Sequence, residues 1–550
     1  MQKGTLRKVL IFVVASLMLL SGCAQAPEIV EKQVVVEKPV VQTVVVEKPV
    51  EKVVLETVVV EKQVVAPTEP AAPAPVAKYV FLFIGDGMGV SQRNAAELFK
   101  GATTSTGARP ESTKLLMNTL PAQGMNTTYD LTSVIPDSAS TATAMASGNK
   151  TASGVVGMDP TGSKAYENLS EIAKAAGMKV GIISSVSIDH ATPAAFYAHQ
   201  LKRGDYYDIA VQLAKSDYDL FAGGPPKKPT GPDKDQRDVI EIAKENGFNI
   251  VVGKDAWEQA SAADGKIWAM PQYYSNSNST YYEMDRPENE VGIAGYVSRA
   301  VEILDNPNGF FLMVEGGKID WACHANDAAA AINDTLAFDA SIQTAYDFYM
   351  EHPDETLIVV TGDHETGGMT IGFAGTKYGS FVDKIAAQEL SQVAFDIELK
   401  AFKDNNSVDT AELEDILPTI EKAYGLKVLS DDERAALEEQ AESDPKAAAE
   451  LALALSDLEL ATLEEAFSES MLDKEVRTAD EYTYLLYGGY EPLSIKCSTI
   501  LNQKAGIAWT SYSHTGVPVQ TSAVGVGCEQ FNGYYDQTNI FDYIVNAAQF

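Results

Sequence analysis

The sequence predicts an α/β fold in which a doubly wound, mostly parallel central sheet is flanked by helices and interrupted by a helical, acidic insertion. Continuous apolar or β-branched runs, which suit strands buried on both faces, occur at 79–84, 179–184, 309–314 and 356–361. Patterns typical of helices lie between these runs, at 167–176, 292–304 and 328–349. Residues 374–490 are rich in Ala, Glu, Asp and Leu, and this composition predicts the helical insertion.

The first 23 residues predict a lipoprotein signal peptide. Lys3, Arg7 and Lys8 precede an apolar run at 9–20, which is too short to span a bilayer but has the length of a signal-peptide core. The Leu-Ser-Gly-Cys that follows resembles a bacterial lipobox, in which Cys23 is lipidated and becomes the mature N-terminus. A plain signal peptide with an incidental cysteine is the alternative. The lipobox predicts a membrane-anchored lipoprotein outside the cytoplasm, at the cell surface or in the periplasm.

Residues 24–77 predict a stalk rather than a folded domain. Val-Val-Val-Glu-Lys occurs three times in this segment, prolines interrupt it, and it has no aromatic residue with which to build a core. Such a composition is typical of an extended, semi-rigid connection. The alternative is that the valine runs pair as strands with a partner.

Charge and cysteine content narrow the class of protein. The 550 residues carry a net charge of −35, which argues against binding to a phosphate backbone and predicts no nucleic-acid partner. Apart from Cys23, three cysteines remain, which is an odd number for an oxidising compartment. We expect Cys323 to stay a thiol. The sequence leaves open whether Cys497 and Cys528 form a disulfide.

Polar residues follow each predicted strand of the first part of the core, residues 78–373. In chain order they are Asp86; Asp189 and His190; Glu315; and Asp363 and His364. Ligands of open α/β sheets bind beyond the carboxyl ends of the strands, so these residues predict a metal site at that edge. Residues 491–550 are expected to complete the same core after the insertion.

Three further positions are candidates for the site. Asp320 and His324 are four residues apart on a predicted helix, so they share one face and can bind one metal ion. His514 lies in a turn rich in Gly and Thr. Ser138 precedes small residues that predict the start of a helix, where free N–H groups attract an anion. Ser138 is therefore either a nucleophile or simply the helix cap.

Six segments, in the order expected, resemble the successive signatures of the alkaline phosphatases. They are IGDGMG at 84–89, DSA at 137–139, ATPAA at 191–195, EGGKID at 315–320, TGDH at 361–364 and HTG at 514–516. The resemblance implies an enzyme that hydrolyses phosphate monoesters through a phosphoserine at Ser138. It also implies a homodimer, because the family is usually dimeric.

The resemblance further implies two zinc ions and one magnesium ion. Asp320, His324 and His514 would hold the first zinc. Asp86, Asp363, His364 and Ser138 would hold the second. Asp86, Thr192 and Glu315 would hold the magnesium. This division suits the chemistry, because zinc accepts imidazole ligands and magnesium prefers oxygen.

The resemblance assigns the phosphate clamp to Arg203, whose planar guanidinium matches two phosphate oxygens, and assigns to Asp137 the role of steadying it. Two positions depart from the best-known enterobacterial members, which carry Asp in place of His190 and Lys in place of Trp321. His190 removes a negative charge and predicts weaker or more exchangeable magnesium. Trp321 removes a cation and predicts looser binding of product phosphate.

Two other functions are compatible with parts of this pattern. A phosphodiesterase of the same metalloenzyme superfamily would share the two-zinc core but typically lack the magnesium set. A non-catalytic, phosphate-binding or adhesive lipoprotein would need no working nucleophile. The role of residues 374–490 is open: they can cover the mouth of the site, form a dimer contact or bind a wall polymer.

Overall fold

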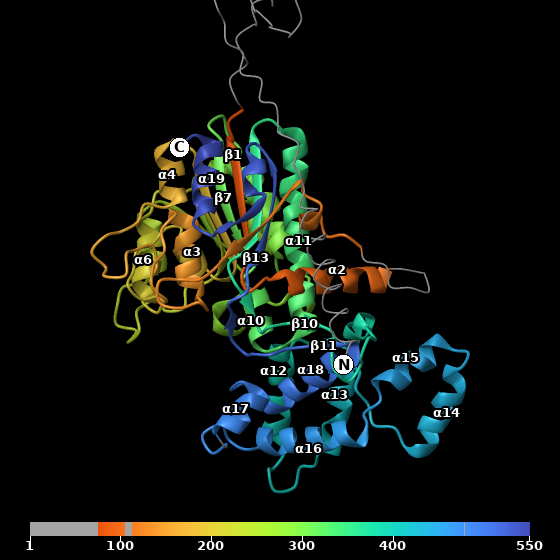
Figure 1. The fold of residues 1–550 in the computed structure, drawn as a ribbon. Helices are drawn as coiled ribbons and strands as arrows, with labels where there is room; N and C mark the ends of the chain where they lie inside the picture. The colour runs from red at the N-terminus through yellow and green to blue at the C-terminus, as the bar shows by residue number, and fades with distance from the viewer. Residues whose placement is uncertain (1–74, 105–112, 478) are drawn as a thin grey trace, which may run out of the picture. The chain divides into compact units, whose positions relative to one another are not determined.

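The computed structural model describes residues 75–104, 113–477 and 479–550, and Figure 1 shows their arrangement. The predictions for residues 1–23, including Cys23, and for nearly all of the stalk 24–77 lie outside the described residues. None of the described helices is both long enough and apolar enough to cross a membrane.

A sheet of ten strands lies at the centre of the described chain. Its order is β14 (Gly533–Asp536), β2 (Ala122–Thr127), β13 (Val519–Gly525), β8 (Thr356–Gly362), β1 (Tyr79–Gly85), β7 (Phe310–Glu315), β3 (Lys179–Ser187), β4 (Leu220–Gly224), β6 (Lys266–Met270) and β5 (Phe248–Val252). Strand β13 is antiparallel to its neighbours β2 and β8, and the other neighbouring pairs are parallel. The predicted mostly parallel sheet is confirmed.

The four predicted strands are neighbours in this sheet, in the order β8, β1, β7 and β3. Nearly all of their residues are buried, which explains the unbroken apolar runs. Alternate side chains of β1 enter different cores: Phe81 and Phe83 belong to one apolar cluster, and Val80 and Leu82 to the other. The sheet is therefore covered on both faces.

Helices form the two covering layers (Figure 1). The cluster of Phe81 includes α2 (Val90–Thr104), α9 (Ile293–Leu304) and α11 (Ala328–Glu351). The cluster of Val80 includes α3 (Ser138–Ser147), α4 (Leu169–Ala175), α5 (Ala191–Ala194), α6 (Tyr206–Lys215), α7 (Val239–Glu245) and α19 (Asn539–Ala548). The three predicted helices correspond to α4, α9 and α11.

Shorter elements connect these layers. They are α8 (Lys254–Gln259), α10 (Lys318–His324), η1 (Leu116–Asn118), η2 (Ala262–Asp264), η3 (Asn276–Asn278), η4 (Glu283–Asp285) and η7 (Cys528–Phe531). Two small antiparallel sheets pair β9 (Glu365–Thr366) with β12 (His514–Thr515) and β10 (Thr370–Ile371) with β11 (Ile507–Ala508).

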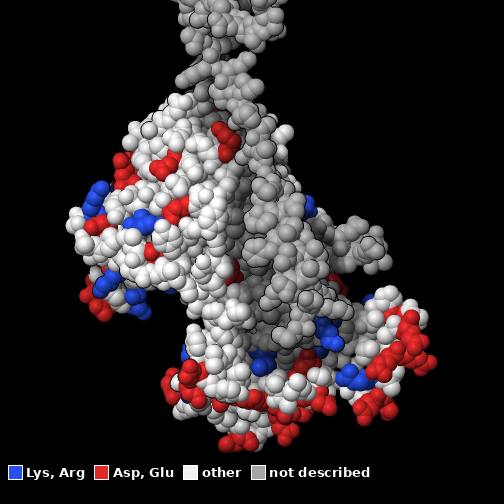
Figure 2. Space-filling view, in the orientation of Figure 1, with Lys and Arg blue, Asp and Glu red and all other residues white. Residues whose placement is uncertain are grey.

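Residues 374–490 are helical, as predicted. Their elements are η5 (Val382–Ala387), α12 (Gln392–Asn405), η6 (Leu413–Asp415), α13 (Leu417–Tyr424), α14 (Asp431–Ala441), α15 (Pro445–Leu453), α16 (Asp457–Met471) and α17 (Glu481–Tyr487). With α18 (Pro492–Ala505) they lie beyond the end of the sheet at which α10 lies (Figure 1). Buried Phe395 and Leu463 join the apolar cluster of α11, so the region packs onto the core. Figure 2 shows that most of the charged side chains on its outer surface are Asp and Glu.

The three described cysteines are free thiols. Cys323 is buried, as is Cys497 on α18, whereas Cys528 is partly exposed. The expectation that Cys323 stays a thiol is confirmed. Cys497 and Cys528, whose pairing the sequence left open, do not form a bridge in this structure.

Candidate active site

Two groups of carboxylate and imidazole atoms lie at the carboxyl edge of the four central strands. One group joins Asp86, Asp363 and His364, and the other joins Asp320, His364 and His514; the ligand-type atoms within each group lie within 4.8 Å of one another. His364 is shared, so the two groups are adjacent. The sequence predicted a metal site at this edge from Asp86, Asp363 and His364, which follow strands, and named Asp320 and His514 as further candidates from a helix and a turn.

The turn after β1 brings Asp86 against the end of β8. Asp86 Oδ1 lies 3.5 Å from His364 Nε2, which lies 3.2 Å from Asp363 Oδ2. Gly87 makes this approach possible, because its φ of 69° is left-handed and a Cβ there would lie 2.8 Å from the Asp320 Cα atom. Its N–H donates to Asp363 Oδ1 at 3.1 Å. The turn is thereby fixed against both neighbouring segments.

Asp320 and His324 lie on α10, one turn apart, with His324 Nε2 3.4 Å from Asp320 Oδ2. His514 reaches them through the pairing of β12 with β9: its Nε2 lies 3.1 Å from His324 Nε2 and 3.7 Å from Asp320 Oδ1. The Nδ1 atoms of His514 and His324 lie 2.8 Å and 2.6 Å from backbone oxygens. Such second contacts leave both Nε2 atoms free to face a metal ion.

Sequence reasoning missed Thr366, which orders this group. Its hydroxyl donates to Asp320 Oδ1 at 2.6 Å and lies 3.3 Å from His364 Nδ1. Thr366 follows His364 by two residues, and this spacing was the only available signal. The same β9 strand that carries Thr366 pairs with the His514 strand.

Asp86, Thr192 and Glu315 form an oxygen-rich corner of the site. Thr192 Oγ1 lies 3.3 Å from Asp86 Oδ2, and Ser184 donates to Glu315 Oε2. Asp86 Oδ1 and Glu315 Oε1 are buried and have no hydrogen-bond partner among the described residues. Burial raises the pKa of Glu315 to about 7, and burial with the nearby Asp363 raises that of Asp86. Buried carboxylates with unpartnered oxygens fit a cation.

Burial and neighbouring charged groups also shift the pKa values of the other residues of the site. Burial and the charge of Asp320 raise the pKa of Asp363 to about 8. The pKa of Asp320 is lowered despite burial, because His324, His514 and His364 surround it. Burial lowers the pKa of His364 and takes that of His190 to about 3, so both imidazoles are neutral. Neutral imidazole is the form that binds metals.

Ser138 begins α3, but Asp137 is the residue that caps the helix: its side chain accepts from Ser140 N. The hydroxyl of Ser138 is therefore not used as a cap, and its Oγ lies 3.3 Å from His364 Nε2. The helix N-terminus at this point favours an anion.

Arg203 donates from Nη1 to Asp137 Oδ2 at 2.8 Å. The charge of Asp137 raises the pKa of Arg203 against the effect of burial. Both Ser138 and Arg203 line one cavity of 380 Å³. Arg203 is thus part of the site rather than an isolated surface charge.

The two positions that depart from the enterobacterial pattern lie side by side at this cavity. The rings of His190 and Trp321 meet edge to face, with centroids 5.7 Å apart. Sequence reasoning missed the rest of the wall, which is formed by Asn276, Ser277, Tyr282, Gln392, Val393 and Tyr490. No motif marks these residues.

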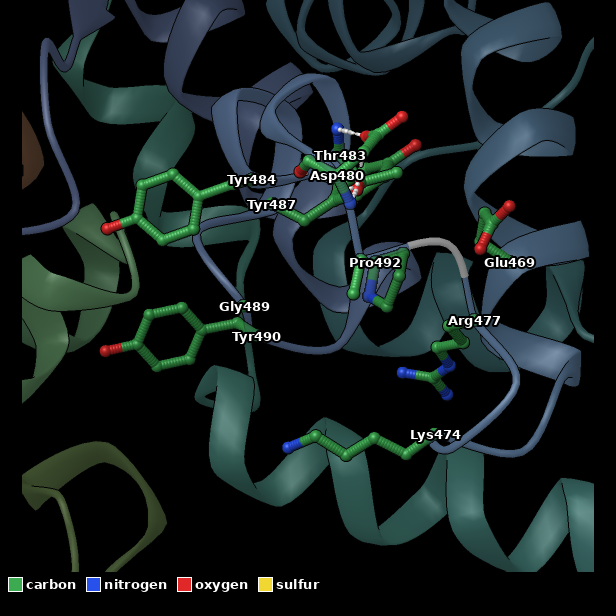
Figure 3. A pocket seen from close by; sticks show the side chains of 11 residues that line it. Glu469, Lys474, Arg477, Asp480, Thr483, Tyr484, Tyr487, Gly489, Tyr490 and Pro492 are labelled. Atoms are coloured by element: carbon green, nitrogen blue, oxygen red, sulfur yellow. Dashed lines mark hydrogen bonds between the residues drawn. The ribbon is translucent and has the colours of Figure 1, made fainter.

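Tyr490 connects the site to a second cavity in the helical region. This cavity has a volume of 240 Å³, and Tyr490 lines both. Figure 3 shows the rings of Tyr484 and Tyr490 projecting in the same direction, with Lys474 and Arg477 extending their charged ends toward the same side. Residues of 374–490 therefore contribute to the wall of the cavity that Ser138 and Arg203 line.

Comparison with known proteins agrees with the geometry. The alkaline phosphatase family matches residues 77–550. Alkaline phosphatase 3 of Bacillus subtilis is 29% identical over 490 residues, covering 86% of this chain and 89% of that protein. The human tissue-nonspecific isozyme is 31% identical over 335 residues, which are 52% of this chain and 63% of that protein.

Solved structures share the fold. The Thermus thermophilus alkaline phosphatase aligns with a TM-score of 0.68 at 22% identity, covering 87% of this chain and 93% of that one. A cold-active alkaline phosphatase from a Shewanella species aligns with a TM-score of 0.64 at 24% identity, covering 86% and 99%. The chain therefore belongs to the alkaline phosphatase family and is a hydrolase of phosphate monoesters.

Proposed function

We propose that the chain hydrolyses phosphate monoesters through a phosphoserine at Ser138, with two zinc ions and one magnesium ion as cofactors. The observation that carries this proposal is that the hydroxyl of Ser138 does not cap its helix but faces the site. This hydroxyl lies at a helix N-terminus, beside His364 and in the same cavity as Arg203. Its nearest functional neighbours are metal-type ligands rather than a general base.

We assign Asp320, His324 and His514 to the first zinc, and Asp86, Asp363, His364 and Ser138 to the second. The mixed imidazole and carboxylate composition of both sets supports this assignment. We assign Asp86, Thr192 and Glu315 to magnesium, because this set offers only oxygen atoms and two of them lack hydrogen bonds. When bound, the ions supply positive charge that lowers the pKa of the Ser138 hydroxyl and stabilises the departing oxygen.

The chain's own residues then act in two displacements. Ser138 Oγ forms a bond to phosphorus as the bond to the leaving oxygen breaks, giving a phosphoserine and an alcohol. Arg203 holds two phosphoryl oxygens, and Asp137 keeps its guanidinium aligned. Water attacks phosphorus from the vacated side, which releases phosphate and restores the Ser138 hydroxyl. Charge neutralisation and in-line positioning supply most of the acceleration.

We further propose that His190 weakens magnesium binding and that Trp321 loosens product phosphate. His190 is buried and its pKa is lowered to about 3 by burial, so it is neutral and adds no negative charge to the site.

For the whole protein, we propose a lipoprotein anchored through Cys23, with residues 24–77 as a stalk between the membrane and the enzyme. The lipobox-like sequence supports the anchor. A homodimer follows by analogy with the family. Mass spectrometry of the mature N-terminus and light scattering of the solubilised protein test these two proposals.

Trapping the intermediate tests the central proposal. Acid quenching during turnover of p-nitrophenyl phosphate, followed by peptide mass spectrometry, should find phosphate on Ser138. Ser138→Ala should lose about 10³-fold or more in kcat, while alanine in place of Ser133, a nearby, partly buried serine that does not line the cavity, should keep full activity. Phosphate on another residue, or an active Ser138→Ala, would reject the assignment. Slow cleavage of bis-p-nitrophenyl phosphate would separate the enzyme from a phosphodiesterase.

A further inference from the structure

Lys318 is a buried cation that the proposed mechanism does not use. Its side chain is 0% exposed, which is rare for lysine. Its Nζ lies 3.7 Å from the ring centroid of Tyr282 and 5.1 Å from that of Trp321. It donates to Ser279 Oγ at 3.1 Å and to Asn276 Oδ1 at 3.4 Å. The ammonium therefore connects α10 to the loop 275–279.

The loop 275–279 is held in a costly backbone conformation. Ser277 and Asn278 are consecutive non-glycine residues with φ of 53° and 59°. A left-handed φ is unfavourable for a non-glycine residue and persists only where the surroundings enforce it. Lys318 holds one side of the loop, and Asn278 Nδ2 donates to Pro226 O at 2.9 Å on the other. The loop is thus built to a defined shape at the cavity wall.

The contact with Lys318 also fixes the direction of the Asn276 amide. An ammonium group has donors and no acceptor, so Asn276 must turn its Oδ1 toward Lys318 and its NH₂ group away. No described residue accepts a hydrogen bond from Asn276 Nδ2. Asn276 is exposed and lines the cavity that contains Ser138. A free N–H donor is therefore available to whatever occupies this wall.

The rest of this wall is neutral and able to hydrogen-bond. Ser277 contributes a hydroxyl, and Tyr490 a phenol whose pKa is raised by burial and by Asp320, so it remains a donor. Trp321 adds an aromatic face. Among the described residues that line the cavity, Arg203 is the only Lys or Arg. Beyond the phosphate clamp, the wall suits hydroxyl groups on a carbon chain or ring better than a second anion.

We propose that Asn276, Ser277 and Tyr490 form a leaving-group subsite for hydroxylated phosphate monoesters, namely polyol and sugar phosphates. In this subsite Lys318 is a positioning residue that acts through Asn276. The proposal rests on the proposed function, because Ser138 and Arg203 must hold the phosphoryl group in the same cavity. A site that hydrogen-bonds a hydroxyl disfavours the analogue lacking it, and for a partly open wall we expect a preference of about tenfold.

The test compares kcat/KM for glycerol 1-phosphate and propyl phosphate, which differ only in two hydroxyl groups. The wild type should prefer glycerol 1-phosphate by about tenfold. Asn276→Ala should remove most of this preference, with propyl phosphate turnover within about twofold of wild type. Asn249→Ala is the control: it removes the amide of an exposed asparagine on β5 that does not line the cavity. It should leave the preference unchanged.

Lys318→Met should reduce the preference as Asn276→Ala does, and the double variant should show no further loss. Lys318→Arg should retain part of the preference, because the guanidinium keeps a donor-only cation. Should Lys318→Met fail to fold, Asn276→Leu serves instead, since its side chain neither donates nor accepts a hydrogen bond and the preference should fall. An unchanged preference in Asn276→Ala or Asn276→Leu, or an equal loss on both substrates, would overturn the proposal.

The two levels of failure are distinguishable. If the wild type forms phosphoserine at Ser138 and cleaves both esters equally, the subsite is wrong and the proposed function stands. If Ser138→Ala remains active on both esters, the proposed function itself is wrong.

Discussion

The carboxyl edge of the sheet and the helical region 374–490 handle acidic side chains in opposite ways. At the edge, Asp86, Glu315 and Asp363 are at most 1% exposed, and two of their oxygens have no hydrogen bond among the described residues. On α14 no residue is buried, and the acidic residues of its first turn lie in solvent.

The difference teaches how to separate functional from solvating acids in a strongly acidic protein. An exposed carboxylate costs almost nothing, whereas a buried one without partners costs several kcal/mol. The buried acids at the sheet edge must therefore be neutralised, either by protonation, which their raised pKa values favour, or by a bound cation. The charge of −35 by itself says little about the site.

The largest contrast is expected for activity. Asp86→Asn should lower kcat/KM by about 10³-fold or more, because it removes an oxygen shared by two proposed metal sets. Asp431→Asn, on the exposed first turn of α14, should leave kcat/KM unchanged. Steady-state kinetics on p-nitrophenyl phosphate measures both. Comparable losses in the two variants would remove the distinction between the regions.

A second contrast concerns packing within the helical region. Leu463 on α16 is 0% exposed and shares an apolar cluster with the core, so Leu463→Ala should destabilise the protein by about 3 kcal/mol. Leu458 on the same helix is 76% exposed, and Leu458→Ala should change stability by less than about 0.5 kcal/mol. Denaturant unfolding measures the difference. A separate early transition in Leu463→Ala would mean that the region folds apart from the core.

The third prediction concerns pH in the metal-free protein. The pKa of Glu315 is raised by burial from 4.5 to about 7, so folding favours its protonated form. Burial of Glu315 does not destabilise the folded protein below pH 4.5, where the carboxyl is protonated in both states. The destabilisation grows as the pH rises toward 7 and reaches its full value above pH 7. Glu315→Gln removes this cost. The free energy of unfolding of the metal-free variant should therefore equal that of the wild type near pH 4.5 and exceed it by up to about 3 kcal/mol at pH 8.

Chemical denaturation of chelated protein at the two pH values provides this measurement. Glu438→Gln on exposed α14 is the control and should show no pH-dependent difference from wild type. A Glu315→Gln variant whose stability difference does not grow between these pH values would show that Glu315 is not strained by burial.

The smallest expected effect is on product binding. Trp321→Lys places a cation at the cavity that holds Ser138 and Arg203, so inhibition by phosphate should strengthen by about tenfold. Trp321→Phe keeps a neutral ring and should leave inhibition unchanged. Product-inhibition kinetics decides the matter, and equal inhibition constants in the lysine variant and the wild type would reject the role given to Trp321.

The strands that the sequence predicted are those whose own residues form a recognisable apolar run. Strands β1, β3, β7 and β8 are buried on both faces, so their apolar runs are unbroken and the polar residues that follow them are easy to recognise. Strand β2 was not predicted, because its burial alternates and its sequence contains Gly and Asn. Propensity is weak evidence for such short strands.

The residues of the site also fall into those that the sequence could predict and those that it could not. The ligand candidates on the strand ends and on α10 follow from spacing, and four of them, Asp86, Asp320, Asp363 and His364, lie in the two clusters of metal-type ligands. Whether Ser138 caps its helix depended on one residue, and the structure shows that Asp137 is the cap. Asn276 and Tyr490 reach the cavity only through packing of segments distant in the chain, so no spacing reveals them.

Metal analysis combined with thermal unfolding tests the central claim most directly. Elemental analysis of the purified protein should give two zinc ions and one magnesium ion per chain. Chelation should abolish activity and lower the Tm, and adding both metals back should restore both. Protein that keeps its full activity and Tm after the metals are removed would contradict the account, because its buried carboxylates would then need no cation.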